Sequence, residues 1–305
     1  MAEITKINKE LVSEFEPARI RVGHKYNFGT ALICAGSEYM SGAAVLATGS
    51  ALRSGAGLVK VFSENKTLDA VRFTEPCALL ELRPDTETDL LRKASGLCQK
   101  TDAVLIGSGM PVDYKHMEAL TGVFLNGAAN VVLDAGALSG KPDVCERLKS
   151  MLRNRKNLAV ITPHTGEFAR LIGVDTGDVT ACSEELALQF ATGNNCIVVL
   201  KGYETLVADP SGKLYRYSRP DSGFAKGGSG DVLAGLITGL LAQHVEPYKA
   251  AVSAVFIHSK AGEAAIKELG IRSVLPSDFI RYLTTGFDKA GWLISDSDRW
   301  FKPDD

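Results

Sequence analysis

The stretch that decides the fold of this chain is Phe224-Ala225-Lys226-Gly227-Gly228-Ser229-Gly230-Asp231-Val232-Leu233-Ala234-Gly235. Three glycines and a serine stand directly before an aspartate, and a helix-like run continues from there to Gln243. Glycines let backbone N–H groups crowd around one point, and a helix N-terminus adds unpaired donors with a partial positive charge. The stretch therefore predicts a concave site for an anion.

The aspartate indicates what this anion site does. Asp231 would repel a bound anion, so it adds nothing to simple anion binding. It is well placed to accept the proton of a hydroxyl that attacks a phosphoryl group. The stretch therefore favours phosphoryl transfer over its alternative, a flexible Gly/Ser turn capped by Asp231.

Upstream of this stretch, short apolar runs alternate with longer helical patterns. Strands are expected at Ala31–Ala35, Leu58–Phe62, Ala103–Ile106, Val131–Leu133, Leu158–Ile161 and Ile197–Leu200. Helices are expected at Ala43–Arg53, Tyr114–Phe124, Asp143–Leu152 and Glu184–Ala191. Such strands are typical of a mostly parallel sheet covered on both faces, and the alternation predicts a doubly wound α/β fold.

The pattern changes near residue 204. Runs at Glu204–Ala208 and Lys213–Tyr217 flank the turn Asp209-Pro210-Ser211-Gly212, which predicts an antiparallel hairpin at the edge of the sheet. Only helices are expected afterwards, at Asp231–Gln243, Tyr248–Leu269 and Pro276–Leu283. Because no linker or repeat interrupts the chain, residues 1–305 are expected to form one domain, with an N-terminal extension (1–22) and a polar, unassigned tail (286–305).

Composition narrows the class of protein. The 305 residues are 45% hydrophobic and 23% charged, with a formal net charge of −2, which is ordinary for a soluble enzyme. We expect no nucleic-acid partner, because no broad basic surface follows, and no membrane span, because no apolar stretch approaches ~18 residues. The six cysteines are scattered, which predicts reduced thiols of a cytoplasmic protein and no zinc site. They are Cys34, Cys77, Cys98, Cys145, Cys182 and Cys196.

Ligands of open α/β sheets bind outside the carboxyl ends of the strands. The small residues from Gly36 to Ala44 would let a flat ligand approach, and tight helix–strand packing explains them equally well. Gly107 and Gly109 indicate either a close ligand or a plain turn. Asp134 could orient a ligand or a metal-bound water, although capping of the next segment is slightly favoured.

Two later loops carry titratable side chains at the same edge. His164 follows Pro163 in a loop and is a functional candidate, whereas Glu167 is explained by the helix dipole alone. Lys201 ends a buried-looking strand, so its ammonium could neutralise phosphate charge. The alternative for Lys201 is a solvated lysine at a strand end.

Taken in order along the chain, these motifs resemble the ribokinase-like superfamily and, more narrowly, the NAD(P)H-hydrate dehydratases, a carbohydrate-kinase-like family of metabolite-repair enzymes. The resemblance implies a three-layer α/β/α fold. It runs from about His24 to about Leu283. It rests on His24-Lys25 with Gly29, Ala35-Gly36-Ser37, Gly42-Ala43-Ala44, 52–59 (LRSGAGLV), Thr162-Pro163-His164 with Gly166-Glu167, Val199-Leu200-Lys201-Gly202, and 227–235 (GGSGDVLAG).

The resemblance also implies an activity. The family removes water from hydrated, damaged NADH or NADPH (NADHX or NADPHX) with the help of a nucleotide. The 6-hydroxyl of the hydrate would attack the terminal phosphate of ADP or ATP, ADP being favoured, with Asp231 as the base. The phosphorylated hydrate would then expel phosphate. Mg²⁺ would shield the phosphates, held mainly by them and by water, so no protein ligand of a metal is expected.

Site residues are carried over from the family to matching positions. Residues of the nucleotide and phosphate site would be Lys201, Gly202, Tyr203, Glu204, Thr205, Gly227, Gly228, Ser229 and Gly230. The hydrate would be contacted by Asp231 together with Ala43, Ala44, Gly107, Gly109 and His164. A homotetramer is expected from the fold family. The family often carries a fused epimerase domain; residues 1–23 are too short for one, so we expect a separate NAD(P)H-hydrate epimerase as a functional partner.

The chain departs from the family pattern at three positions. Thr165 replaces the second proline of Thr-Pro-His-Pro-Gly-Glu, Ser108 replaces the proline of Gly-Pro-Gly, and Gly136 replaces the second aspartate of Asp-Ala-Asp-Ala-Leu. Only the last could remove a polar contact. Two other functions stay open: a kinase for a sugar or vitamin precursor, whose product keeps the phosphate, and a non-catalytic nucleotide sensor, against which Asp231 argues.

Overall fold

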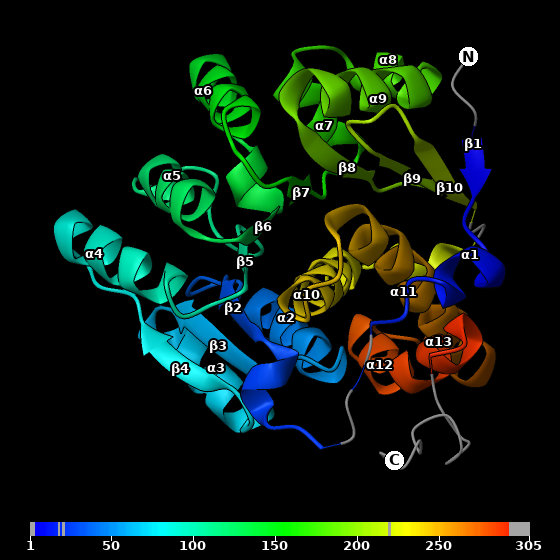
Figure 1. Cartoon of the computed structure of the whole chain (residues 1–305), viewed down its shortest axis with the longest axis horizontal. Coiled ribbons are helices and arrows are strands. Elements are labelled where there is room, and N and C mark those ends of the chain that lie inside the picture. The colour runs from blue at the N-terminus through cyan, green and yellow to red at the C-terminus, as the bar shows by residue number, and fades with distance from the viewer. Residues whose placement is uncertain (1–3, 18, 20–21, 219–220, 293–305) are drawn as a thin grey trace, which may run out of the picture.

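A single β-sheet runs through the described part of the chain (Figure 1). The structure is a computed structural model that describes residues 4–17, 19, 22–218 and 221–292. Its strand order over these residues is β1-β10-β9-β8-β7-β6-β5-β2-β3-β4. The strands are β1 (Ile4–Lys6), β2 (Thr30–Cys34), β3 (Leu58–Ser63), β4 (Leu79–Leu82), β5 (Ala103–Ile106), β6 (Asn130–Leu133), β7 (Ala159–Ile161), β8 (Cys196–Leu200), β9 (Glu204–Ala208) and β10 (Leu214–Ser218).

Strand β9 is antiparallel to both of its neighbours, β8 and β10, whereas the other neighbouring strands pair in parallel. The predicted hairpin and the mostly parallel sheet are thus confirmed. The hairpin is not the outermost element, because β1 pairs with β10 on its far side. Residues expected to form an N-terminal extension therefore contribute a strand to the sheet.

Helices cover both faces of the sheet, which confirms the three-layer α/β/α arrangement (Figure 1). One face packs against α1 (Lys9–Ser13), α2 (Ser41–Arg53), α3 (Asn65–Thr74), α10 (Ser229–Ala242), α11 (Pro247–Leu269) and α13 (Leu283–Ala290). The other packs against α4 (Glu87–Cys98), α5 (Met117–Gly127), α6 (Pro142–Arg153), α7 (Thr165–Ile172), α8 (Thr176–Ala181) and α9 (Ser183–Asn194). Short α12 (Pro276–Arg281) packs on α11 and α2.

Alternate residues of one strand enter the two cores, as the two-residue period of a strand requires. In β2, Ile33 packs in the core on the α10 side, and Leu32 and Cys34 pack in the core on the α5 side. All three are fully buried. A strand buried on both faces reads as a continuous apolar run, which is why these central strands could be predicted from the sequence.

The sequence did not predict β1, β4, α1, α3, α4, α8 or α13, and of α7 it predicted only a helix start at Glu167, two residues after the observed start at Thr165. Strand β4 reads Leu-Leu-Glu-Leu, without the β-branched residues that mark strands, and it lies at the far edge with Leu79 47% exposed. Near the C-terminus, α13 runs on to Ala290, and the buried Trp292 donates its indole N–H to the Val12 carbonyl at 2.9 Å. Trp300 lies outside the described residues.

The chain reverses direction in the sheet between β2 and β5. From β2 it proceeds outward to β3 and β4, and then returns to the other side of β2 as β5. At such a switch point the loops leave in opposite directions and open a crevice at the carboxyl ends of the strands. The loops after β2 and β5 meet there, where the Gly36 amide donates to the Ser108 carbonyl at 2.8 Å.

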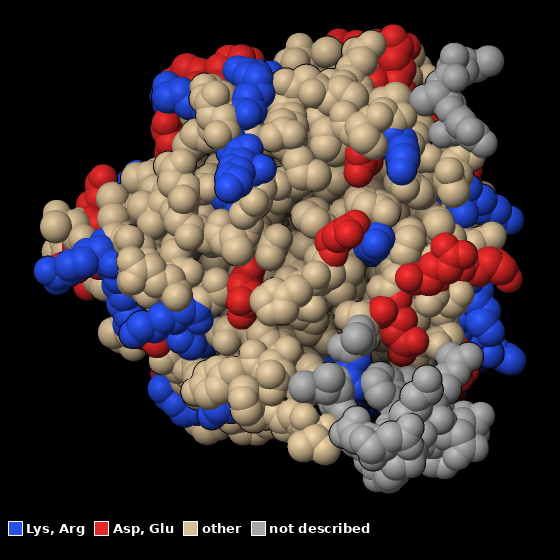
Figure 2. Space-filling model, in the orientation of Figure 1, with Lys and Arg blue, Asp and Glu red and all other residues tan. Residues whose placement is uncertain are grey.

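Charges of both signs are spread over the face shown in Figure 2, and neither sign covers it as a whole. This distribution agrees with the formal net charge of −2. Within the ranges that the structure describes, the helices are all too short or too polar to cross a membrane.

Candidate active site

A cleft of about 1090 Å³ opens at the carboxyl ends of β6, β7 and β8, beside the N-terminus of α10. Its lining includes Asp134, His164, Lys201, the segment 224–231 and His258 of α11. The cleft therefore gathers residues from elements that are far apart in the sequence, at the edge where ligands of α/β sheets bind.

The glycine-rich stretch forms the turn that leads into α10. Gly228 is the residue before the helix and has a φ of 103°, a conformation that glycine adopts without strain. A Cβ atom at Gly227 would meet nothing within 4 Å, so this side of the turn is open to the cleft. The first residues of the helix thus present backbone N–H groups and the positive end of the helix dipole to a ligand.

Close packing of α10 on α2 positions this helix N-terminus. A Cβ atom at Gly235 would lie 2.2 Å from the Ala47 carbonyl oxygen, and one at Gly239 would lie 2.0 Å from the Ser54 hydroxyl oxygen. The Ser50 hydroxyl donates to the Val232 carbonyl at 2.7 Å. The glycine spacing therefore lets the two backbones approach closely enough to hold the start of α10 at the cleft.

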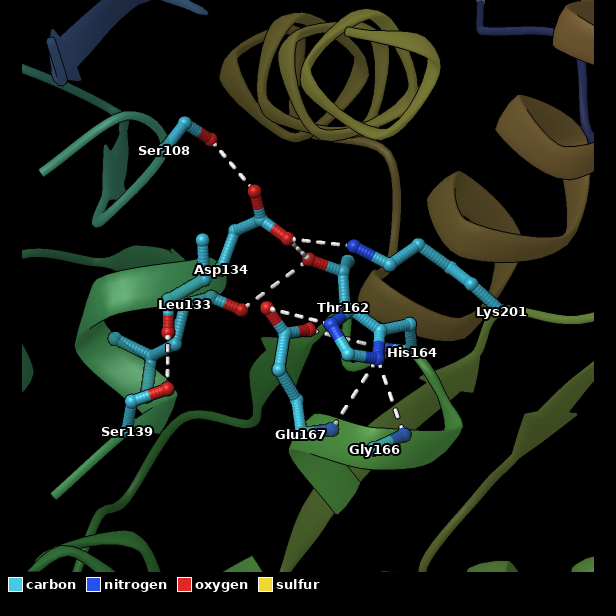
Figure 3. A network of polar contacts seen from close by, with 10 residues as sticks. Ser108, Leu133, Asp134, Ser139, Thr162, His164, Gly166, Glu167 and Lys201 are labelled. Atoms are coloured by element: carbon cyan, nitrogen blue, oxygen red, sulfur yellow. Dashed lines mark hydrogen bonds and ion pairs between the residues drawn. The ribbon is translucent and has the colours of Figure 1, made fainter. Parts of the chain in front are cut away.

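Asp134 is the centre of a polar network on the floor of the cleft (Figure 3). Its side chain is buried, and its Oδ2 accepts a hydrogen bond from the Ser108 hydroxyl at 2.7 Å. Its Oδ1 accepts from the Thr162 hydroxyl and from the Lys201 ammonium, both at 2.8 Å. Asp134 makes no side-chain capping bond to the short helix η2 (Ala135–Leu138), so the capping role favoured by the sequence is wrong.

Lys201 and Asp134 form an ion pair in which both groups stay charged. Burial alone would raise the pKa of Asp134, but the Lys201 charge and the hydrogen bonds to the carboxylate outweigh it and lower that pKa. Burial alone would lower the pKa of Lys201, but the charges of Asp134 and Glu167 outweigh it and raise that pKa. Lys201 is therefore not a solvated lysine at a strand end, because its ammonium is paired with the buried Asp134 carboxylate.

Asp231 lies in the first turn of α10 and lines the same cleft as Asp134 and Lys201. Its pKa is raised to about 7, first by burial and then by the negative charge of Asp134. Lys201 and the Ser108 hydroxyl act in the opposite direction, and Glu167 raises this pKa further. A carboxyl group that titrates near neutral pH is suited to general-base catalysis.

His164 is oriented by the helix that follows it. Its Nδ1 accepts hydrogen bonds from the backbone N–H groups of Gly166 at 3.0 Å and Glu167 at 3.3 Å (Figure 3). A ring nitrogen that accepts carries no proton, so these bonds assign the proton of the neutral imidazole to Nε2. The side chain is 55% exposed, its Nε2 lies 3.4 Å from Glu167 Oε1, and His164 lines the cleft.

The structure brings most of the predicted site residues together. The cleft is lined by Asp231, His164, Lys201, Gly202, Tyr203, Thr205 and residues 227–230. Glu204 lies outside this lining and is 3.6 Å from the Arg216 guanidinium. Ala43, Ala44, Gly107 and Gly109 lie at the adjoining β2–β5 switch point, where a Cβ atom at Gly109 would be 2.5 Å from the Ala43 Cβ.

Sequence reasoning missed the roles of three residues in or behind this cleft. Thr162 and Ser108 donate hydrogen bonds to Asp134 from outside the cleft lining, and each follows a strand that the sequence did predict. Lys226 donates to the carbonyl oxygens of Arg272 at 2.7 Å and Val274 at 2.5 Å. Lys226 lies within the glycine-rich stretch 224–235, directly before Gly227, and this position could have marked it as a candidate.

No group of three His, Cys, Asp or Glu residues that could hold a metal ion occurs in the described ranges. The carboxylates that line the cleft include Asp134, Glu167, Asp221 and Asp231. The Asp134 carboxylate already accepts three hydrogen bonds. A divalent ion in this cleft would therefore take most of its ligands from a bound phosphate and from water.

Comparison with known proteins identifies the family of this chain. Residues 31–285 match a family model described as NAD(P)H-hydrate dehydratase. The chain is 33% identical over 173 residues to the ADP-dependent (S)-NAD(P)H-hydrate dehydratase of Bacillus subtilis, a stretch that covers 57% of this chain and 59% of that protein. The aligned part thus spans less than two thirds of this relative.

Solved structures extend the match over nearly the whole chain. The ADP/ATP-dependent NAD(P)H-hydrate dehydratase of Bacillus subtilis, co-crystallised with ATP and Mg²⁺, is 30% identical, with a TM-score of 0.83, and the alignment covers 94% of this chain and 99% of that one. A ribokinase-like superfamily protein from Enterococcus faecalis is 24% identical, with a TM-score of 0.80 and coverage of 95% and 97%. The second match bears on the fold alone and agrees with the predicted ribokinase-like class.

Proposed function

Because the chain belongs to the NAD(P)H-hydrate dehydratase family, we propose that it removes water from hydrated NADH or NADPH in a nucleotide-dependent reaction. The observation that carries this proposal is the position of Asp231. Its carboxyl group lies at the start of α10, beside the glycine turn, with a pKa raised to about 7. We call the turn formed by residues 227–230, with its backbone N–H groups, the anion cradle. Such a cradle with a base beside it suits the transfer of a phosphoryl group to a hydroxyl.

In the first step, the 6-hydroxyl oxygen of the hydrate attacks the terminal phosphorus of ADP or ATP. Asp231 accepts the hydroxyl proton as the new P–O bond forms and the bond to the departing nucleotide breaks. The backbone N–H groups of residues 227–230 stabilise the negative charge of the transferring group. Lys201, whose ammonium is 2.8 Å from Asp134 Oδ1, would contact the phosphates beside Gly230, where a Cβ atom would lie 3.2 Å from its Nζ.

In the second step, the phosphorylated hydrate expels phosphate. The electron pair of the ring nitrogen assists the break of the C–O bond, and loss of a proton from the neighbouring carbon restores the dihydronicotinamide. The sum of both steps is the loss of water from the hydrate and the hydrolysis of one nucleotide phosphate bond. The enzyme is accordingly a carbon–oxygen lyase that consumes a nucleotide.

The nucleotide would occupy the cleft, and the hydrate would extend from the cleft to the adjoining β2–β5 switch point. Gly202, Tyr203 and Thr205 line the cleft on the β8–β9 side and would contact the nucleotide. Glu204 belongs to the segment 201–205 that is predicted to contact the nucleotide, although it lies outside the cleft lining. The hydrate would be contacted by His164 of the cleft and, at the switch point, by Ala43, Ala44, Gly107 and Gly109.

The proposal has further parts that rest on the family resemblance. Mg²⁺ shields the phosphate charge and is held by phosphate oxygens and water. The protein works as a homotetramer and in functional partnership with an NAD(P)H-hydrate epimerase activity. Its six cysteines are free, and Cys34, Cys98, Cys145 and Cys196 are buried, which favours a reducing compartment such as the cytoplasm.

The test is recovery of absorbance at the dihydronicotinamide band. Protein, NADH-hydrate and Mg²⁺ are mixed with either ADP or ATP, and phosphate release is followed in parallel. We expect NADH and phosphate to appear at equal rates, and Asp231→Ala to abolish both. Nucleotide consumption without NADH would indicate a small-molecule kinase instead, because the product of a kinase keeps the phosphate.

A further inference from the structure

A second cavity lies beside the switch point, at the carboxyl ends of β3 and β4, and has a volume of about 290 Å³. The loop after β2 borders both sites. Its Glu38 lines the cavity, and its Met40 carbonyl oxygen would be 2.8 Å from a Cβ atom at Gly109. The first residues of α3 and the loop after β4 also line the cavity. A ligand at the switch point would therefore have this cavity next to it.

Arg83 and Glu64 line this cavity and form a loose ion pair that leaves two polar atoms unsatisfied. The Arg83 side chain is 5% exposed, and its Nη2 is 3.7 Å from Glu64 Oε2, which is beyond hydrogen-bond distance. This Nη2 donates to the Gly36 carbonyl at 3.4 Å. Within the part of the chain that the structure describes, the buried atoms Arg83 Nη1 and Glu64 Oε1 have no hydrogen-bond partner. A group that satisfies both atoms would therefore be bound favourably.

A hydroxyl group matches this pair of atoms, because its oxygen accepts from a guanidinium N–H while its O–H donates to a carboxylate. A phosphate matches it poorly, because Arg83 would attract it and Glu64 would repel it. The whole lining is acidic, since three carboxylates against two cations leave one negative charge in excess. These charged residues are Glu38, Glu64, Asp85, Lys66 and Arg83.

The hydrated dinucleotide can reach this cavity from the cleft. Strands β5, β2, β3 and β4 are consecutive in the sheet (Figure 1). With a strand spacing of about 4.8 Å, the carboxyl ends of β5 and β4 lie roughly 14 Å apart. A dinucleotide consists of two nucleoside halves joined by a pyrophosphate, and its extended form covers such a span. With its nicotinamide half between Asp231 and the switch point, its adenosine half would lie over β3 and β4.

We propose that this cavity binds the ribose of the adenosine half through its hydroxyl groups and that its carboxylates select NADH-hydrate over NADPH-hydrate. The inference rests on the proposed function, because the dinucleotide hydrate is the substrate of that reaction. The two hydrates differ only by a phosphate on the 2′-hydroxyl of this ribose. That phosphate removes a hydroxyl that can satisfy Arg83 and Glu64, and it brings about two negative charges to an acidic lining.

The first test compares kcat/KM for NADH-hydrate and NADPH-hydrate at saturating nucleotide and Mg²⁺. The wild type should favour NADH-hydrate by about tenfold or more. Glu64→Gln keeps the shape of the side chain and removes its charge, so it should reduce this preference by about threefold to tenfold. Asp69 of the same helix α3 lies outside the cavity lining, with its side chain 57% exposed. Asp69→Asn is therefore the matched control and should leave the preference in place.

The second test needs no turnover. The fluorescence of the dihydronicotinamide reports binding of NADH, of NADPH and of reduced nicotinamide mononucleotide, which lacks the adenosine half. NADH should bind about tenfold more tightly than NADPH, and Glu64→Gln should narrow this difference without changing the affinity for the mononucleotide.

Equal affinity for NADH and NADPH would overturn the inference, because it is expected if water alone satisfies Arg83 and Glu64. An equal effect of Asp69→Asn would overturn it as well. A preference for NADH that Glu64→Gln narrows, in a protein without dehydratase activity, would support the role of the cavity and refute the proposed function.

Discussion

Replacing Asp231 with asparagine should stabilise the ligand-free protein at alkaline pH although it abolishes the proposed activity. In the folded protein the pKa of Asp231 is raised from 3.8 to about 7 by burial and by the Asp134 charge. Between these two values the folded state binds more protons than the unfolded state, so stability is lost as the pH rises. Asparagine has no charge to bury at any pH and escapes this loss.

The size of the effect follows from the pKa difference. A difference of about three units, at about 1.4 kcal/mol per unit, corresponds to roughly 4 kcal/mol at pH 8 and to less than about 1 kcal/mol at pH 4. The chain has 305 residues. With an unfolding entropy of about 2.1 cal/mol/K per residue, Asp231→Asn should raise Tm by roughly 6 °C at pH 8 and by about 1 °C at pH 4.

Scanning calorimetry without nucleotide, at both pH values, measures this difference. Asp113→Asn removes an exposed carboxylate and should change Tm equally little at both. If Asp231→Asn raised Tm equally at pH 4 and pH 8, or lowered it at pH 8, the reasoning would be refuted. Either result would mean that the folded protein does not disfavour the Asp231 carboxylate.

Two further substitutions test the parts that hold the cradle. Gly235→Ala should destabilise the protein by about 1–3 kcal/mol, because its Cβ would lie 2.2 Å from the Ala47 carbonyl; urea denaturation measures this, and Gly96→Ala, with nothing within 4 Å, should be neutral or stabilising. A loss of stability as large in Gly96→Ala would contradict the packing argument. Lys226→Met removes the donor to the carbonyl of Val274 at 2.5 Å and should weaken Mg²⁺–ADP binding about fivefold by calorimetry; unchanged affinity would exclude Lys226 as a support of the cradle.

The elements that sequence reasoning found are those whose signal is local. The strands β2, β5, β6 and β8 are buried on both faces, so they could be predicted from short runs of apolar residues in the sequence. The hairpin β9–β10 was visible from its turn residues. In contrast, β1 and β4 are short edge strands, whose formation depends on a neighbour that the local sequence does not contain.

The site divides in the same way. The proposed chemistry of Asp231 could be predicted because the glycines, the helix start and the carboxylate are contiguous in the sequence. The ion-pair partner of Lys201 could not be predicted, because Asp134 lies 67 positions away in the sequence. The two side chains come into contact only because β6 and β8 end at the same edge of the sheet. A strand-end lysine looks the same in sequence whether its ammonium faces solvent, phosphate or a buried aspartate.

By itself the sequence determined the α/β class, and it predicted the position of the anion cradle and the residue that we propose takes the proton. Each of these depends on a backbone conformation or a residue type that neighbouring positions specify. The tertiary structure decided which charges face Asp231, and therefore that its pKa lies near neutral pH. Burial and Coulomb interactions act through space between separate strand ends, so only the folded sheet sets them.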